Sequence, residues 1–127
     1  MRINLSSVFV DDQRKALRFY TSILGFLKKT ELPAGEFRWI TVVSPEGPED
    51  IELLLEPNDN PIARTYQKDI FEAGIPATTF AVENMQEEYE RLRELGVEFR
   101  QQPTRTGPVT VAVFDDTCGN LIQIVQA

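Results

Sequence analysis

The sequence repeats itself, and this repeat limits the folds open to the chain more than any other feature. Residues 8–26 show a short apolar strand, two carboxylates, an amphipathic helix, a glycine and a second strand. The same order returns at residues 80–97. Equivalent positions lie 71 or 72 residues apart, as Val10 and Val82 do, and one deletion accounts for the difference. The chain is therefore predicted to contain two copies of one βαβββ unit.

Each helix of the repeat has its own start and stop signals. Asp11 or Asp12 can accept hydrogen bonds from the free amide groups of the first helix. Its apolar residues recur at the three-and-four spacing of one helical face. Gly25 then stands where a left-handed residue commonly ends a helix. An asparagine and a glycine take the corresponding places in the second copy, so we expect helices at 12–24 and 84–95.

The rest of the chain supplies the strands and one further helix. Pro61 follows an asparagine, which predicts a helix start with proline at its first position. We expect an α+β domain with one module at about 1–56, a linker helix within about 57–74, and a second module at about 75–127. A turn is predicted at 32–35 and a loop at 103–108. Strands are predicted at 3–10, 26–31, 37–43, 51–55, 76–82, 97–101, 109–114 and 121–126.

Composition excludes several classes of function. The net charge of −7 argues against nucleic acid or an anionic membrane as a partner, since little here would neutralise phosphates. No stretch is long and apolar enough for a signal peptide or a membrane span. The chain has no histidine, so Ser-His-Asp and Cys-His nucleophiles are absent. Its single cysteine, Cys118, suits a reducing compartment, and we expect the protein to be cytoplasmic.

Two motifs within the repeat make the chain resemble a known family. They are F-Y-T-S-I-L-G-F after the paired aspartates and D-D-T-C-G-N-L-I-Q-I near the end. Both resemble the vicinal-oxygen-chelate superfamily, which contains glyoxalase I, bleomycin-resistance proteins and extradiol dioxygenases. The resemblance covers essentially the whole chain. It implies two βαβββ modules whose curled sheets share a cleft, usually in a homodimer.

The resemblance also implies where a metal would lie. Metal-dependent relatives hold a divalent ion with one residue on the first strand and one on the last strand of each module. By register these positions are Leu5, Glu52, Ala77 and Gln123. Leu5 and Ala77 have no donor atom, which leaves one carboxylate and one amide, too few for a tight site. We therefore predict no bound metal and no cofactor.

Four polar residues are candidates for the ligand site. Glu52 and Gln123 each look like a lone polar group in an apolar strand. The alternative for Glu52 is an exposed carboxylate on an edge strand, and the alternative for Gln123 is an amide that ties two strands together. In the cleft Glu52 would either bind a ligand or act as a catalytic base. Ser7 and Thr79 share the strand parity of the family's metal positions and would donate to a ligand or fill space in the sheet.

Arg38 and Trp39 are neighbours in one strand, so they face opposite sides of it. Arg38 would suit a ligand carboxylate or a pairing with Glu52. Trp39 would suit a planar or cationic ligand, and its alternative is ordinary core. Alternation along the strand does not tell which of the two lines the cleft.

Two classes of function follow from these residues. One is a metal-free protein that binds or sequesters a small organic molecule in a homodimer, as bleomycin-resistance proteins are understood to do. The other is an acid–base enzyme of isomerase or lyase type, with Glu52 as its base and Gln123 or Arg38 as the electrophilic partner. An accessory domain without a small ligand is a third reading. The binding protein is the hypothesis carried forward.

Overall fold

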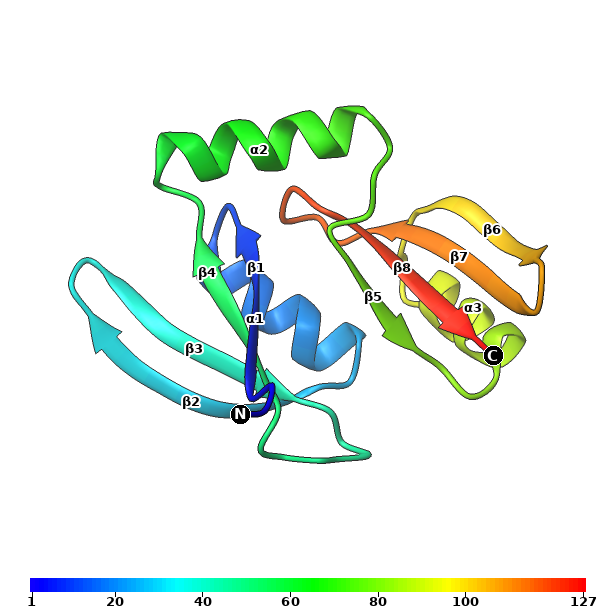
Figure 1. Ribbon diagram of the computed structural model, residues 1–127, viewed down its shortest axis with the longest axis horizontal. Helices are drawn as coiled ribbons and strands as arrows, with labels where there is room; N and C mark the ends of the chain where they lie inside the picture. The colour runs from blue at the N-terminus through cyan, green and yellow to red at the C-terminus, as the bar shows by residue number, and fades with distance from the viewer. The chain divides into compact units, whose positions relative to one another are not determined.

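The computed structural model describes the whole chain, residues 1–127, as two compact units, Met1–Arg64 and Thr65–Ala127 (Figure 1). Each unit holds one four-stranded mixed sheet. Helix α2 (Pro61–Glu72) spans the boundary between the units. The α+β fold of two tandem βαβββ modules is thus confirmed. No helix is long and apolar enough to cross a membrane.

The first sheet has the strand order β1-β4-β3-β2, in which β1 and β4 run parallel and the other neighbours antiparallel. The second sheet repeats this pattern as β5-β8-β7-β6. The elements of the first unit are β1 (Leu5–Val10), α1 (Gln13–Arg18), η1 (Phe19–Ile23), β2 (Leu27–Ala34), β3 (Phe37–Val43) and β4 (Glu52–Pro57). Those of the second are β5 (Thr78–Ala81), α3 (Met85–Glu94), β6 (Phe99–Thr106), β7 (Val109–Asp115) and β8 (Leu121–Gln126).

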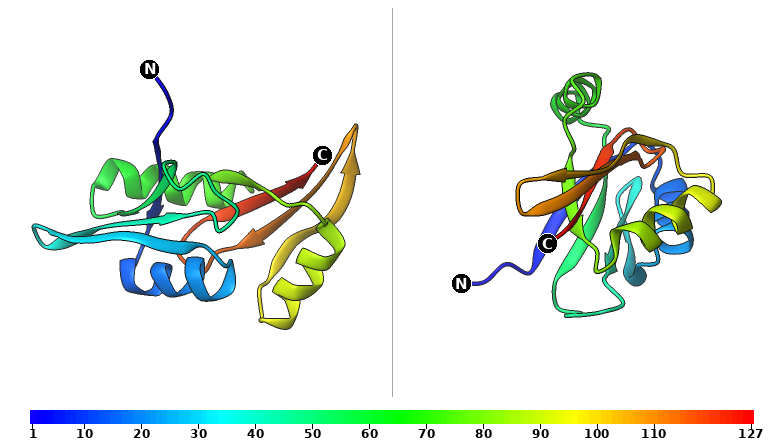
Figure 2. Two further views of the ribbon diagram at one scale, coloured as in Figure 1. Left: turned by 90° about the horizontal axis from the view of Figure 1, so that it is seen from below. Right: turned by 90° about the vertical axis from the view of Figure 1, so that its right-hand side faces the viewer.

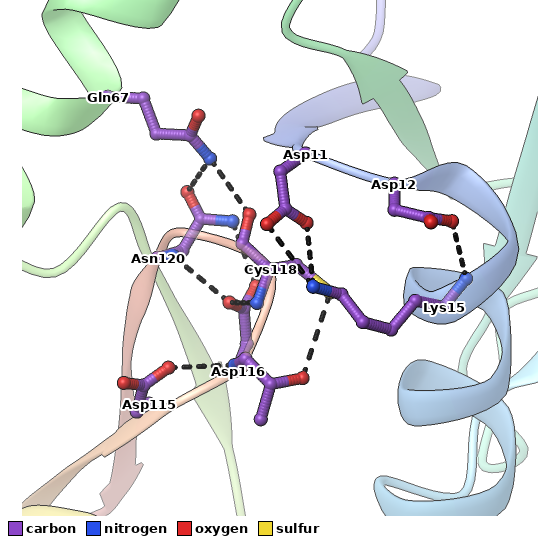
Figure 3. Close-up of polar contacts among 9 residues, drawn as sticks. Asp11, Asp12, Lys15, Gln67, Asp115, Asp116, Cys118 and Asn120 are labelled. Carbon is purple, nitrogen blue, oxygen red and sulfur yellow. Dashed lines mark hydrogen bonds and ion pairs between the residues drawn. The ribbon is translucent and has the colours of Figure 1, made fainter.

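The predicted caps are present in both modules. Asp12 is the N-cap of α1 and accepts a hydrogen bond from the backbone N–H of Lys15 at 2.9 Å (Figure 3). Asn84 does the same for α3, with Glu87 as the donor at 3.1 Å. Gly25 follows the first helical segment with a φ of 92°. The two helices therefore begin by the same mechanism at equivalent positions of the repeat.

The first helix departs from the predicted α-helix at 12–24. After Arg18 the chain continues as the π-helical segment η1, in which Leu24 donates its N–H to the carbonyl of Phe19 at 3.0 Å. A π turn holds one residue more than an α turn. Phe19 and Tyr20 are adjacent in sequence, yet both are buried.

The predicted turn at 32–35 and the predicted loop at 103–108 were wrong. Strand β2 continues to Ala34 and β6 to Thr106, so the hairpins turn at residues 35–36 and 107–108. Each of these two-residue turns begins with a glycine at positive φ. The prolines that suggested loops lie in β2 and β6, which are edge strands that do not need every N–H.

One face of each sheet is covered by its own helical segment, as Figure 2 shows. Alternation along the strands sends most of the apolar core to this side, although Thr41, Val43 and Leu54 are buried on the other side of the first sheet. In the first unit the covered core includes Val8, Val10, Ala16, Tyr20, Ile40, Val42 and Leu55. In the second it includes Met85, Leu92, Ala112, Phe114, Ile122 and Ile124. The opposite sides are called below the first and the second helix-free face.

The cap of α1 makes part of the stability sensitive to acid. The hydrogen bond from the Lys15 backbone lowers the pKa of Asp12 below its ordinary value of 3.8. A lowered pKa means that the folded state favours the carboxylate, so its contribution is complete above pH 3.8 and is lost as the pH falls through the folded-state pKa. We expect Asp12→Asn, whose amide oxygen caps without titrating, to gain stability relative to wild type between pH 6 and 3. Urea unfolding at both pH values measures this, and an unchanged difference would contradict the assignment.

Candidate functional site

The first helix-free face consists of alternate side chains of its four strands. Thr41 pairs with Leu54 across β3 and β4, and its hydroxyl donates to Oε1 of Glu52 at 2.7 Å. Glu52 is therefore on this face, and its partner Leu5 of β1 lies beside it. Ser7 follows two residues along β1, opposite Leu54. The sequence candidates Glu52 and Ser7 thus share one face of one sheet.

Glu52 is not the lone polar group that the sequence predicted. Thr41 is fully buried and holds one carboxylate oxygen. The ammonium of Lys29 lies 4.0 Å from the other oxygen, Oε2, while donating to the backbone carbonyl of Glu49 at 2.6 Å. Lys29 reaches this side because it occupies the irregularity between Lys28 and Thr30, where β2 and β3 shift register. The Glu52 side chain is half-buried, with Thr41 as its hydrogen-bond donor and Lys29 as its countercharge.

Exposed apolar side chains surround these polar groups. Trp39, two residues before Thr41 on β3, is 40% exposed, and its cross-strand partner Leu32 is 56% exposed. Leu5 and Leu27, toward the other end of the face, are 40% and 54% exposed. This face therefore combines oriented polar groups with accessible apolar surface.

Arg38 does not pair with Glu52, as one interpretation of the sequence had it. Its Nε lies 2.9 Å from Oε2 of Glu31, and Glu31 has its pKa lowered by the hydrogen bond from Lys28 and then by Arg38. The backbone N–H and carbonyl of Arg38 both bond to the side chain of Gln13 at the start of α1. Since Arg38 alternates with Trp39, it lies on the helix-covered side. Trp39 is the one on the helix-free face.

Gln13 also fixes the spacing of the two central strands. The last paired residues of β3 and β4 are Thr41 and Leu54. Beyond them the Nε2 of Gln13 donates to the carbonyls of both Arg38 and Leu55, at 2.7 and 2.9 Å. One amide thus replaces the missing ladder bonds and keeps β3 beside β4 at this end of the face.

The second helix-free face holds the other two candidates. Gln123 of β8 is paired with Thr79 of β5, and its Nε2 donates to the Thr79 hydroxyl at 3.2 Å. By the repeat, Ala77 and Gln123 correspond to Leu5 and Glu52, which pair in the first unit, so the register of β5 on β8 differs by two residues from that of β1 on β4. The hydrogen bonds of the two modules also differ. Glu52 accepts from the hydroxyl of Thr41 on β3, whereas Gln123 donates to the hydroxyl of Thr79 on β5.

These residues do not fit a divalent metal. Leu5 and Ala77 have no donor atom, and the Gln123 amide nitrogen is turned to a hydroxyl. The ammonium of Lys29 beside Glu52 would repel a cation. Nowhere do three or more His, Cys, Asp or Glu side chains form a group that could hold one. The family's metal chemistry therefore has no matching donor set in this chain.

The second sequence motif, D-D-T-C-G-N, forms a structural loop between β7 and β8. Oδ1 of Asp116 accepts the backbone N–H groups of Cys118 and Asn120 at 2.7 and 3.0 Å, and Oδ2 accepts the Asn120 side-chain amide at 2.8 Å (Figure 3). Gln67 of α2 donates to the Cys118 carbonyl and to the Asn120 Oδ1. This motif therefore maintains the loop conformation and has no free carboxylate for chemistry.

Comparison with known proteins agrees with this architecture. The family model described as Glyoxalase/Bleomycin resistance protein/Dioxygenase superfamily matches residues 2–124. The uncharacterized protein YurT of Bacillus subtilis (strain 168) is 60% identical over 126 residues, 99% of each chain. The crystal structure of UcmS2 matches with a TM-score of 0.86 and 32% identity over 100% of this chain and 98% of its own. TnmS3, an antibiotic binding protein from Streptomyces sp. CB03234, matches with a TM-score of 0.79 and 27% identity over 99% and 95%.

Proposed function

The chain belongs to the glyoxalase/bleomycin resistance protein/dioxygenase superfamily, and we propose that it binds a small organic molecule, without a metal ion, on its first helix-free face. The observation that carries this proposal is the hydrogen-bonded pair of Thr41 and Glu52 amid exposed Trp39, Leu32 and Leu5. A few oriented polar groups within apolar surface are the usual composition of a small-molecule site.

Two further observations support binding as the activity. The antibiotic-binding TnmS3 has the same fold over nearly the whole chain. Trp39 leaves 40% of its surface accessible, although a tryptophan kept only for packing would normally be more deeply buried. The shared cleft implied by the family resemblance stays a prediction.

A homodimer and a cytoplasmic location belong to the same proposal. The accessible leucines and the tryptophan of the first helix-free face form apolar surface of the kind that a second copy or a ligand covers. The one cysteine, Cys118, is a buried free thiol, which suits a reducing compartment.

An acid–base enzyme is the second candidate, and one contact favours it. Thr41 fixes one oxygen of Glu52 and leaves Oε2 with no hydrogen bond from the protein. An oxygen held in this way is placed to take a proton from a bound substrate. Turnover distinguishes the two candidates, because a binding protein returns its ligand unchanged whereas an isomerase or lyase yields a new species by NMR.

The binding proposal predicts a large effect of Trp39→Ala. A panel of aromatic antibiotics and metabolites screened by thermal shift should contain molecules that raise the melting temperature, because a ligand of the native state stabilises it. For such a molecule we expect Trp39→Ala to weaken binding by about 10- to 100-fold, from the loss of about 1.5–3 kcal/mol of apolar contact. Calorimetry measures the affinity of each variant.

Two variants control this experiment. Trp39→Phe keeps an aromatic ring and should retain most of the affinity. Tyr66→Ala removes a different exposed aromatic side chain, on α2, and should leave binding within about twofold of wild type, as surface substitutions away from a site usually do. If Trp39→Ala binds as tightly as wild type, the ligand does not lie on the first helix-free face.

A further inference from the structure

The two carboxylates of the first helix-free face have different environments. Glu52 is hydrogen-bonded to Thr41 and lies near Lys29. The side chain of Glu56, four residues further along β4, makes no hydrogen bond or ion pair with the rest of the chain, although the residue is half-buried and its backbone is in the β1–β4 ladder. It is therefore the carboxylate of this face whose charge has no partner.

Glu56 and Trp39 lie on the same face of the first sheet, on the neighbouring strands β4 and β3. Two residues on from the paired Thr41 and Leu54, along antiparallel strands, are Trp39 on β3 and Glu56 on β4. The bonds of Gln13 to Arg38 and Leu55 hold the two strands together at this level. Trp39 and Glu56 are beyond the last paired residues of β3 and β4, so they flank the end of the ladder and are not a cross-strand pair. The indole and the carboxylate thus lie on one face at the end of the β3–β4 ladder, with Phe9 beside Glu56 and Leu32 beside Trp39.

We infer that the ligand of this face is an amphipathic cation whose amine lies between the Trp39 ring and the Glu56 carboxylate. The inference rests on the proposed function and adds the chemical class of the ligand. An indole face attracts an ammonium through its quadrupole, and a carboxylate attracts it through its charge. An apolar body would rest on Leu32 and Trp39, which are both well exposed.

The charges of the face favour a cation over an anion. This face has two carboxylates, those of Glu52 and Glu56, and one ammonium, that of Lys29. The Lys29 ammonium already donates a hydrogen bond to the backbone carbonyl of Glu49. The whole chain carries a net charge of −7, which repels anions at long range. An anionic ligand would therefore approach Trp39 against both the local and the overall charge.

Three probes with one apolar body test the inference: 2-naphthylmethylamine, 2-naphthalenemethanol and 2-naphthoate. Trp39 is the sole tryptophan, so its indole N–H signal in the NMR spectrum reports binding at this position. We expect the amine to bind about tenfold more tightly than the alcohol, because its ammonium is attracted by the Trp39 ring and by the partly exposed Glu56 carboxylate. The naphthoate should bind most weakly of the three. Added salt should reduce the preference for the amine.

Glu56→Gln is the decisive variant, since it removes the charge and keeps the shape. The tenfold preference for the amine should fall to about twofold, with alcohol binding unchanged, because only the charged term is removed. Glu31→Gln is the matched control. It removes one carboxylate from the opposite side of the same sheet, where Glu31 is partly exposed in pairs with Lys28 and Arg38, and it should leave the preference intact.

The possible failures can be told apart. If Trp39→Ala weakens the ligands found by screening but Glu56→Gln keeps the preference for the amine, the proposed function holds and the inference is wrong. If the three probes bind equally, or none shifts the indole signal, the inference is also overturned. If Trp39→Ala instead turns a dimer into a monomer by sedimentation, a second copy of the chain covers this face, and both the inference and the site assignment are wrong.

Discussion

Replacing Asp116 by alanine is expected to lower the free energy of unfolding by about 3 kcal/mol. The carboxylate is fully buried and accepts two backbone N–H groups and one side-chain amide. Alanine leaves all three donors without this acceptor in a place that water does not reach, and each such loss costs about 1–3 kcal/mol. Removal of a buried charge offsets part of the sum.

Two variants separate the hydrogen bonds of Asp116 from its charge. Asp116→Asn keeps an oxygen for the two backbone donors and turns an amide toward Asn120, so we expect a loss of about half the alanine value. Asp115→Ala removes the neighbouring carboxylate, which accepts the N–H of Thr117 at 2.7 Å and lies 3.6 Å from Arg100. This half-buried group should contribute about 1 kcal/mol. Urea unfolding followed by circular dichroism measures all three, and equal losses for Asp115→Ala and Asp116→Ala would contradict this account.

Much of the fold could be predicted because its signals are local and occur twice. Asp12 and Asn84 cap their helices, and both modules have the same strand order. The errors concern the second half of the first helix, which is π-helical, and the ends of strands. Pro33 in β2 and Pro103 in β6 suggested loops, but an edge strand tolerates a residue without an N–H. The repeat therefore predicts which elements form better than it predicts where they end.

The candidate site was less predictable because it depends on register and on an irregular strand. Gln123 pairs with Thr79, whereas its equivalent Glu52 pairs with Leu5, and parallel strands joined by a long connection have no turn to set their register. Lys29 reaches Glu52 from a bulge, where simple alternation no longer applies. Thr41 did have a signal, because it shares the strand parity of Trp39.

The role of Gln67 was also missed by the sequence pattern. In α2 the aromatic Tyr66 is 55% exposed, whereas the polar Gln67 beside it in sequence is 5% exposed. A glutamine can be buried here because its amide finds partners in the carbonyl of Cys118 and the side chain of Asn120. Hydrophobic periodicity does not predict the burial of a polar side chain whose hydrogen-bond partners lie in a loop about fifty residues away in sequence.

Gly119→Ala is expected to lower the free energy of unfolding by about 2–3 kcal/mol, for two separable reasons. Gly119 has a φ of 100°, which strains any residue with a Cβ. An added Cβ would also lie 2.7 Å from Nε2 of Gln67, so the Gln67 side chain would have to leave its two acceptors in the loop. The first effect belongs to the backbone alone, and the second requires the glutamine.

A double-mutant cycle with Gln67→Ala separates the two effects. In the Gln67→Ala background the clash is absent, so Gly119→Ala should cost only the backbone strain of about 1 kcal/mol. The single Gln67→Ala change should itself cost about 1–2 kcal/mol through its lost hydrogen bonds, and the double variant should be less destabilised than the sum of the two. Strict additivity would show that Gln67 and the loop do not touch in solution. A coupling of about 1 kcal/mol or more would show that α2 is held to the β7–β8 loop by this side chain.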